Sequence, residues 1–124
     1  MFVTKNKLIL IGTTILLLAA WLRLNDIGAD PFMADQERIS VLASNFARDG
    51  DWQILGTRMS VGSLKHSPLT IYLYALPYSL DHNPRIARIF TALVNLVAVA
   101  LVQLIGRRYF SPITGLLAAF FLAI

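Results

Sequence analysis

Residues 89–105 read IFTALVNLVAVALVQLI, an uncharged and largely apolar stretch that is closely followed by Arg107 and Arg108. As an α-helix rising about 1.5 Å per residue, this stretch would cover roughly 25 Å, close to the ~30 Å hydrocarbon core of a bilayer. Asn95 and Gln103 are polar but uncharged, so we expect each of them to face another helix rather than lipid. The stretch therefore predicts a helix that crosses a membrane.

A second apolar stretch, LILIGTTILLLAAWLRL, occupies residues 8–24 and follows Lys5 and Lys7. Its one charge, Arg23, lies close enough to the end to extend toward the membrane interface. A cleaved signal peptide also places basic residues before an apolar stretch. The length of this stretch and the bulky Trp21 beside Arg23, a poor neighbourhood for cleavage, favour a membrane-spanning helix instead.

The last apolar stretch, ITGLLAAFFLAI at residues 113–124, follows Ser111 and Pro112. A helix of this length would reach only about 18 Å, which is too short to cross a bilayer. We therefore expect a third span that is cut short, in a chain that forms the N-terminal part of a longer protein with several spans.

The composition agrees with lipid as the surroundings of these stretches. Hydrophobic residues make up 56% of the chain and charged residues only 15%, whereas soluble proteins carry about 25% charged residues. The chain contains no cysteine, which excludes disulfides and cysteine metal sites.

The charges are distributed as in a membrane protein. The short flanks at Lys5, Lys7, Arg107 and Arg108 carry only positive charge, which is typical of cytoplasmic segments. All acidic residues lie between the two long apolar stretches: Asp26, Asp30, Asp35, Glu37, Asp49, Asp51 and Asp81. We therefore expect residues 25–86 to form an extracytoplasmic loop, and we expect no nucleic-acid partner despite the net charge of +4.

The loop is long enough to hold structure of its own. Ile39, Leu42 and Phe46 recur at helical spacing and predict an amphipathic helix near residues 36–49. A second helix is expected near residues 68–76, after a serine cap and a proline. Pro77 should interrupt the apolar stretch there, which leaves it too short to cross the bilayer, so we expect both helices to lie in the membrane interface. Three tyrosines of this stretch suit that level: Tyr72, Tyr74 and Tyr78.

Polar side chains of this loop are the candidates for chemistry, because the familiar catalytic signatures are absent. They are Asp35, Glu37, Arg38, Arg58, Lys65 and His66. Asp35 should cap the first loop helix, where the positive helix end favours a carboxylate. Lys65 and His66 precede the second helix, at a position suited to anions. A solvated loop surface would explain any one of these residues equally well.

The order of these motifs resembles the polyprenol-phosphate-dependent membrane glycosyltransferases. These GT-C enzymes, similar to glycosyltransferase family 39, include protein O-mannosyltransferases and lipid A aminoarabinose transferases. The resemblance rests on the order of four motifs over nearly the whole chain: Asp35-Gln36-Glu37-Arg38, Gly50-Asp51-Trp52, His66-Ser67-Pro68-Leu69 with Tyr72, and Arg85-Ile86-Ala87-Arg88. The chain departs from the family pattern at Gln36 and Ile39, which leaves the acceptor open.

The resemblance implies an all-α membrane protein, the N-terminal part of a multi-span GT-C-like bundle in a bacterial cytoplasmic membrane. It implies transfer of a sugar from a polyprenyl-phosphate carrier to a lipid, glycan or protein acceptor. Asp35 would be the catalytic base, with Glu37, Arg38, Arg58, Lys65 and His66 binding substrate. His66 would also be the ligand of a divalent metal ion, if the enzyme uses one. This N-terminal part is expected to be inactive alone.

Two other functions fit the residues. A transporter subunit would carry ionisable residues inside its spans, whereas the long apolar stretches here hold only Asn95 and Gln103 as strongly polar interior residues. A non-catalytic membrane assembly protein would not need a large loop that holds two helices. The sequence alone favours the enzyme over both.

Overall fold

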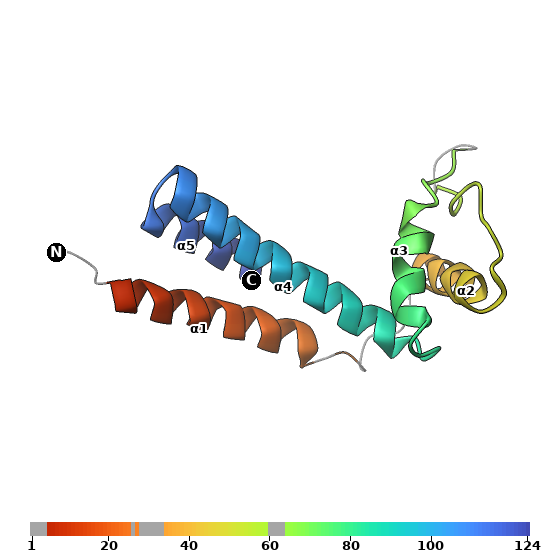
Figure 1. Cartoon of the computed structure of the whole chain (residues 1–124), viewed down its shortest axis with the longest axis horizontal. Coiled ribbons are helices and arrows are strands. Elements are labelled where there is room, and N and C mark those ends of the chain that lie inside the picture. Colours follow the sequence, from red (N-terminus) through yellow and green to blue (C-terminus); the bar gives the residue numbers. More distant parts are fainter. Residues whose placement is uncertain (1–4, 26, 28–33, 60–63) are drawn as a thin grey trace. The chain divides into compact units, whose positions relative to one another are not determined.

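The computed structural model describes residues 5–25, 27, 34–59 and 64–124. Within these residues the fold is all-helical, and a single antiparallel bridge between Arg58 and Lys65 is the only β-type pairing (Figure 1). The helices are α1 (Lys5–Leu24), α2 (Ala34–Asp49), α3 (Leu69–Tyr78), α4 (Arg85–Tyr109) and α5 (Pro112–Ala123). The chain divides into two compact units: Met1–Ile27 with Thr91–Ile124, and Gly28–Phe90.

α1 and α4 are long and apolar enough to cross a membrane. α1 begins three residues before the predicted 8–24 stretch, and α4 extends the predicted 89–105 stretch by four residues at each end. Only 17% and 22% of their most apolar windows are buried, whereas the core helix of a soluble protein is mostly buried. Length, composition and exposure therefore agree in making these two helices candidate membrane spans.

The first unit is held together by small residues where its helices meet. Its buried cluster consists of Ile15, Ala19, Val99, Leu116, Ala119 and Ala123. An added Cβ at Gly106 of α4 would lie 2.5 Å from the Cα of Gly115 of α5, so the two backbones touch. Close approach through small residues is how helices associate in lipid, where apolar burial alone gives no gain.

α5 starts with a serine cap, as the Ser111-Pro112 pair suggests. The Ser111 Oγ accepts a hydrogen bond from the Thr114 amide at 3.1 Å, and Pro112 occupies the first turn, where its missing amide costs nothing. The helix covers Pro112–Ala123, close to the predicted 113–124.

The two amide side chains of α4 differ in their surroundings. Gln103 is 9% exposed, and an added Cβ at Gly12 of α1 would overlap its side-chain amide, so Gln103 packs against a neighbouring helix as predicted. Asn95 is exposed. Its expected contact with another helix is not made among the described residues and stays a prediction.

The guanidinium of Arg23 binds the end of α5. Its guanidinium donates to the carbonyl oxygens of Ala123 at 2.7 Å and Leu122 at 2.8 Å. The side chain thus joins the carboxyl end of α1 to the end of α5. A cation suits this position, because the end of a helix carries partial negative charge.

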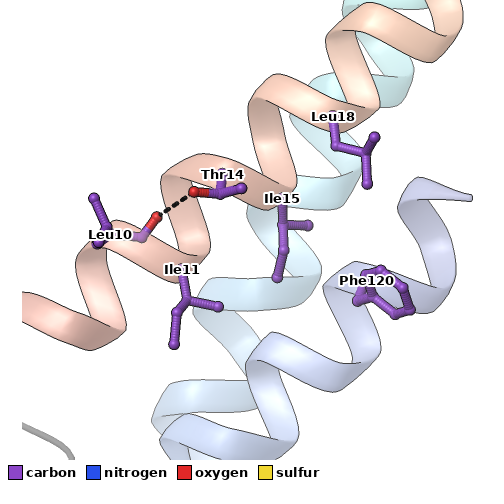
Figure 2. A pocket seen from close by; sticks show the side chains of 6 residues that line it. All are labelled: Leu10, Ile11, Thr14, Ile15, Leu18 and Phe120. Carbon is purple, nitrogen blue, oxygen red and sulfur yellow. Dashed lines mark hydrogen bonds between the residues drawn. The ribbon is translucent and has the colours of Figure 1, made fainter.

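An open apolar groove of about 210 Å³ lies between α1 and α5. Figure 2 shows its lining: Leu10, Ile11, Thr14, Ile15, Leu18 and Phe120. The Thr14 hydroxyl donates to the Leu10 carbonyl oxygen at 3.0 Å within α1. The groove therefore offers no free donor to orient a polar substrate.

The second unit packs α2 against α3 and the first turn of α4. Ala43, Ile71, Tyr78 and Ala87 form its buried cluster. α2 ends as expected at Gly50, whose φ of +68° is costly for other residues and whose amide bonds to the Phe46 carbonyl at 3.0 Å.

Three local predictions need correction. α2 begins at Ala34, so Asp35 lies inside the first turn rather than at the cap. α3 begins at Leu69, with Pro68 at the cap position, while the Ser67 Oγ accepts a hydrogen bond from the Leu69 amide at 3.3 Å. Pro77 does not interrupt this helix: it lies in the last turn, where only one helical hydrogen bond is lost.

The tyrosine at the end of α3 also departs from expectation. Tyr78 is only 1% exposed and belongs to the core of the second unit, so it does not sit at a membrane interface. The leucines on the opposite side of α3 are exposed instead. The helix is apolar all round, and packing against α2 decides which side is buried.

Candidate functional site

The predicted site residues fall into two groups, all of them exposed. Asp35, Glu37 and Arg38 lie at the amino end of α2. Arg58, Lys65 and His66 lie in the non-helical segment between α2 and α3. The carboxylates of Asp35 and Glu37 are placed where the positive end of the helix dipole favours negative charge.

A short antiparallel pairing organises the second group. The His66 amide donates to the Thr57 carbonyl at 2.9 Å, and the Met59 amide donates to the Leu64 carbonyl at 3.0 Å. These two bonds flank Arg58 and Lys65, which therefore face each other as a non-hydrogen-bonded pair. Side chains in such a pair project from the same face of the ladder and lie close together.

Gly56 allows the pairing to close. Its amide donates to the His66 carbonyl at 3.0 Å. An added Cβ at this position would lie 2.6 Å from the same carbonyl oxygen and 2.8 Å from that of Ser67. Only glycine lets the two backbones approach this closely, and the approach fixes His66 beside the start of α3.

The structure does not join the two groups. Among the described residues, no hydrogen bond or ion pair links the acidic end of α2 with Arg58, Lys65 or His66. Figure 1 shows the paired segment beyond the amino end of α3, whereas α2 crosses α3 nearer its middle. A site that uses both groups therefore needs contacts beyond those that the described residues make.

A metal site is not assembled around His66. Within the described residues, no three histidine, aspartate or glutamate side chains gather where they could hold an ion. Asp30, the acidic residue closest before Asp35, lies outside the described residues. The role of His66 as a metal ligand stays a prediction.

One ion pair stands at the other end of α2. Arg48 and Asp49 are joined at 2.7 Å, with side chains 62% and 53% exposed. The hydrogen bond from Arg48 lowers the pKa of the Asp49 carboxyl below its ordinary value, and the positive charges of Arg48 and His82 act in the same direction. Nearby, the Ser44 hydroxyl lies 3.5 Å from His82 Nδ1, which ties α2 to the turn before α4.

An aromatic cluster joins two of the loop motifs. The ring of Phe46 lies 5.0 Å from those of both Trp52 and Tyr72, and Trp52 lies 5.5 Å from Tyr72, all at steep angles. Edge-to-face packing of this kind contributes about 0.5–1.5 kcal/mol per pair beyond burial. The Tyr72 hydroxyl also donates to the Gln53 carbonyl.

The aromatic cluster was missed by the sequence reasoning, which placed Phe46 on an amphipathic face and Tyr72 at the interface. Its signal is present, since Trp52 directly follows the Gly50-Asp51 stop of α2. The same reasoning missed Tyr78, whose hydroxyl is buried with no hydrogen-bond partner within the described residues.

Comparisons of the chain with protein-family models, with curated proteins and with solved structures find no match.

Proposed function

We propose that the chain belongs to a membrane glycosyltransferase that moves a sugar from a polyprenyl-phosphate carrier to a lipid, glycan or protein acceptor. The order of the four loop motifs supports this proposal. One structural observation carries it further: the Gly50-Asp51-Trp52 motif and the α3 motif pack on each other and on α2 through Phe46, Trp52 and Tyr72. Two motifs that are separate in sequence are thus in contact.

In this proposal Asp35 is the general base. It would take the proton of the acceptor hydroxyl or amine as that group attacks the anomeric carbon. The bond between this carbon and the phosphate oxygen breaks, the configuration inverts, and polyprenyl phosphate leaves. A positioned base of this kind contributes about 10²- to 10⁴-fold to the rate. The exposure of Asp35 leaves it open to an acceptor.

The leaving phosphate needs positive charge beside it. Arg58 and Lys65 face each other on one side of their pairing and have no acidic partner among the described residues, so they suit this role. His66 would assist them, or hold a divalent metal ion if one takes part. Glu37 and Arg38, near Asp35 on α2, would bind the acceptor.

The proposal locates the reaction at the outer face of a bacterial cytoplasmic membrane. The two candidate spans support a location in a membrane. The positively charged flanks support the assignment of the loop to the outer side of that membrane. Residues 25–86 would then be extracytoplasmic, with the aromatic cluster and both groups of polar residues on that side.

A transfer assay tests the proposal. Because this chain is expected to be inactive alone, the assay uses membranes from cells making the longer protein that contains it. They are incubated with polyprenyl-phosphate-linked sugar, with a matched nucleotide sugar as control, and labelled products are separated. We expect transfer from the lipid-linked donor alone, and chelation of divalent ions tests the metal role of His66. Transfer from the nucleotide sugar, or from neither donor, contradicts the proposal and favours a non-catalytic assembly protein.

A further inference from the structure

α3 presents an apolar side that nothing in the described chain covers. Its buried residues are Ile71, Ala75, Pro77 and Tyr78. On the opposite side, four leucines recur at helical spacing: Leu69, Leu73, Leu76 and Leu80, which are 69%, 44%, 61% and 83% exposed. This leucine stripe runs along α3 and continues to Leu80, two residues after the helix ends. Stripes of this kind are buried against protein or lipid, because water disfavours a continuous apolar surface.

The segment that leads into α3 carries two cations in an unusual arrangement. Arg58 and Lys65 form a cross-strand pair on one face of the pairing. Like charges directly opposite one another are destabilising. Neither side chain has an ion-pair or hydrogen-bond partner among the described residues, and residues 52–69 contain no aspartate or glutamate. An anion beside this cation pair would relieve the repulsion.

We propose that the leucine stripe and the cation pair form one docking surface for an anionic lipid bilayer. The stripe enters the boundary of the acyl chains, and the cation pair lies at the level of the lipid phosphates. Interfacial segments with an apolar side and adjoining basic residues bind anionic membranes in this way. The surface does not depend on the transfer reaction.

Chain connectivity favours a bilayer as the occupant. Residues 28–90 follow α1 at one end and continue into α4 at the other, and both helices are long enough to cross a membrane. The bilayer is therefore present at high effective concentration without a separate binding step. Figure 1 shows the paired segment leading directly into the amino end of α3, so both parts of the surface come from adjoining chain.

A spin label at position 76 tests the proposal. The chain has no cysteine, so Leu76→Cys gives a single labelling site within it. The labelled protein is reconstituted in vesicles of phosphatidylcholine alone or mixed with phosphatidylglycerol. Collisions of the label with oxygen, which enters lipid, and with a water-soluble nickel chelate report its depth. We expect high oxygen and low nickel accessibility in the anionic vesicles.

The cation pair is tested by Arg58→Gln with Lys65→Gln in the labelled protein. Each cation near an anionic surface is worth about 1 kcal/mol, so the ratio of docked to undocked label should fall about 5-fold per charge removed. The control, Arg48→Gln with Arg85→Gln, removes two exposed cations of the same unit and should leave the ratio unchanged. High nickel accessibility, exclusion of both reagents by covering protein, or equal depth in neutral vesicles would each overturn the proposal.

Discussion

Replacing Gly115 with alanine tests how closely α4 and α5 pack. An added Cβ there would lie 2.6 Å from the carbonyl oxygen of Gln103 and 2.7 Å from the amide nitrogen of Arg107. Both are backbone atoms of α4, so no side-chain rotation relieves the overlap. Carbon atoms pack best at about 3.5–4.0 Å, which requires α5 to move away by roughly 1 Å.

That displacement sets the expected cost. Overpacking typically costs about 1–3 kcal/mol, while alanine gains up to about 1 kcal/mol over glycine in a helix interior. We therefore expect Gly115→Ala to lower the free energy of unfolding by about 1–2 kcal/mol. The assay is a titration of the micelle-bound protein with a denaturing detergent, followed by the loss of helical circular dichroism.

Gly12→Ala is the matched control for this prediction. The added Cβ would meet the amide end of the Gln103 side chain, which can rotate away. The control should therefore stay near the wild-type stability. If Gly115→Ala were as stable as Gly12→Ala, the backbone contact between α4 and α5 would not exist in the folded protein.

Three further predictions concern the second unit and its side of the membrane. Tyr78→Phe removes a buried hydroxyl that lacks a partner among the described residues and should raise the free energy of unfolding by about 1 kcal/mol. A fall of that size, measured in denaturation, would reveal a hidden hydrogen bond. Because Arg48 lowers the pKa of Asp49, this pair stabilises the fold above the unfolded pKa of about 3.9 and loses that effect as the pH falls through the lower folded pKa. In denaturation measured at several pH values, Arg48→Gln should reduce the loss of unfolding free energy at acid pH. The reduction should be small because both side chains are more than half exposed. Cysteines at the exposed Thr70 and Tyr109 should react oppositely with an impermeant thiol reagent, Thr70 from outside the cell, and the reverse pattern would overturn the assigned orientation.

The sequence was a good guide to where helices form and a poorer one to where they begin. Apolar stretches and the Gly50 stop predicted the helices, because backbone hydrogen bonds in lipid must be satisfied within each segment. The start of α2 was misjudged, since an aspartate is equally at home at the cap and in the first turn. Pro77 was read as an interruption, although a proline in a last turn breaks only one bond.

Side-chain environments were harder to predict than helices. α3 is apolar all round, so periodicity could not show that Tyr78 would be buried and Leu76 exposed. Asn95 and Gln103 looked equivalent in the sequence, yet only Gln103 meets a glycine on a neighbouring helix. The grouping of Arg58 with Lys65 depends on their antiparallel pairing, whereas their separation from Asp35 depends on tertiary packing that no local pattern records.

The most direct test of the proposed function is the transfer rate of Asp35→Asn in the longer protein that contains this chain. Asparagine keeps the shape of the side chain but cannot accept a proton, so transfer from the lipid-linked sugar should fall by about 10²- to 10⁴-fold. Asp49→Asn makes the same change at the other end of α2, at an exposed carboxylate bonded to Arg48, and should retain near-normal transfer. Both variants should insert into membranes at the wild-type level. Near-normal transfer by Asp35→Asn, or an equal loss in both variants, would contradict the role of Asp35 as the base.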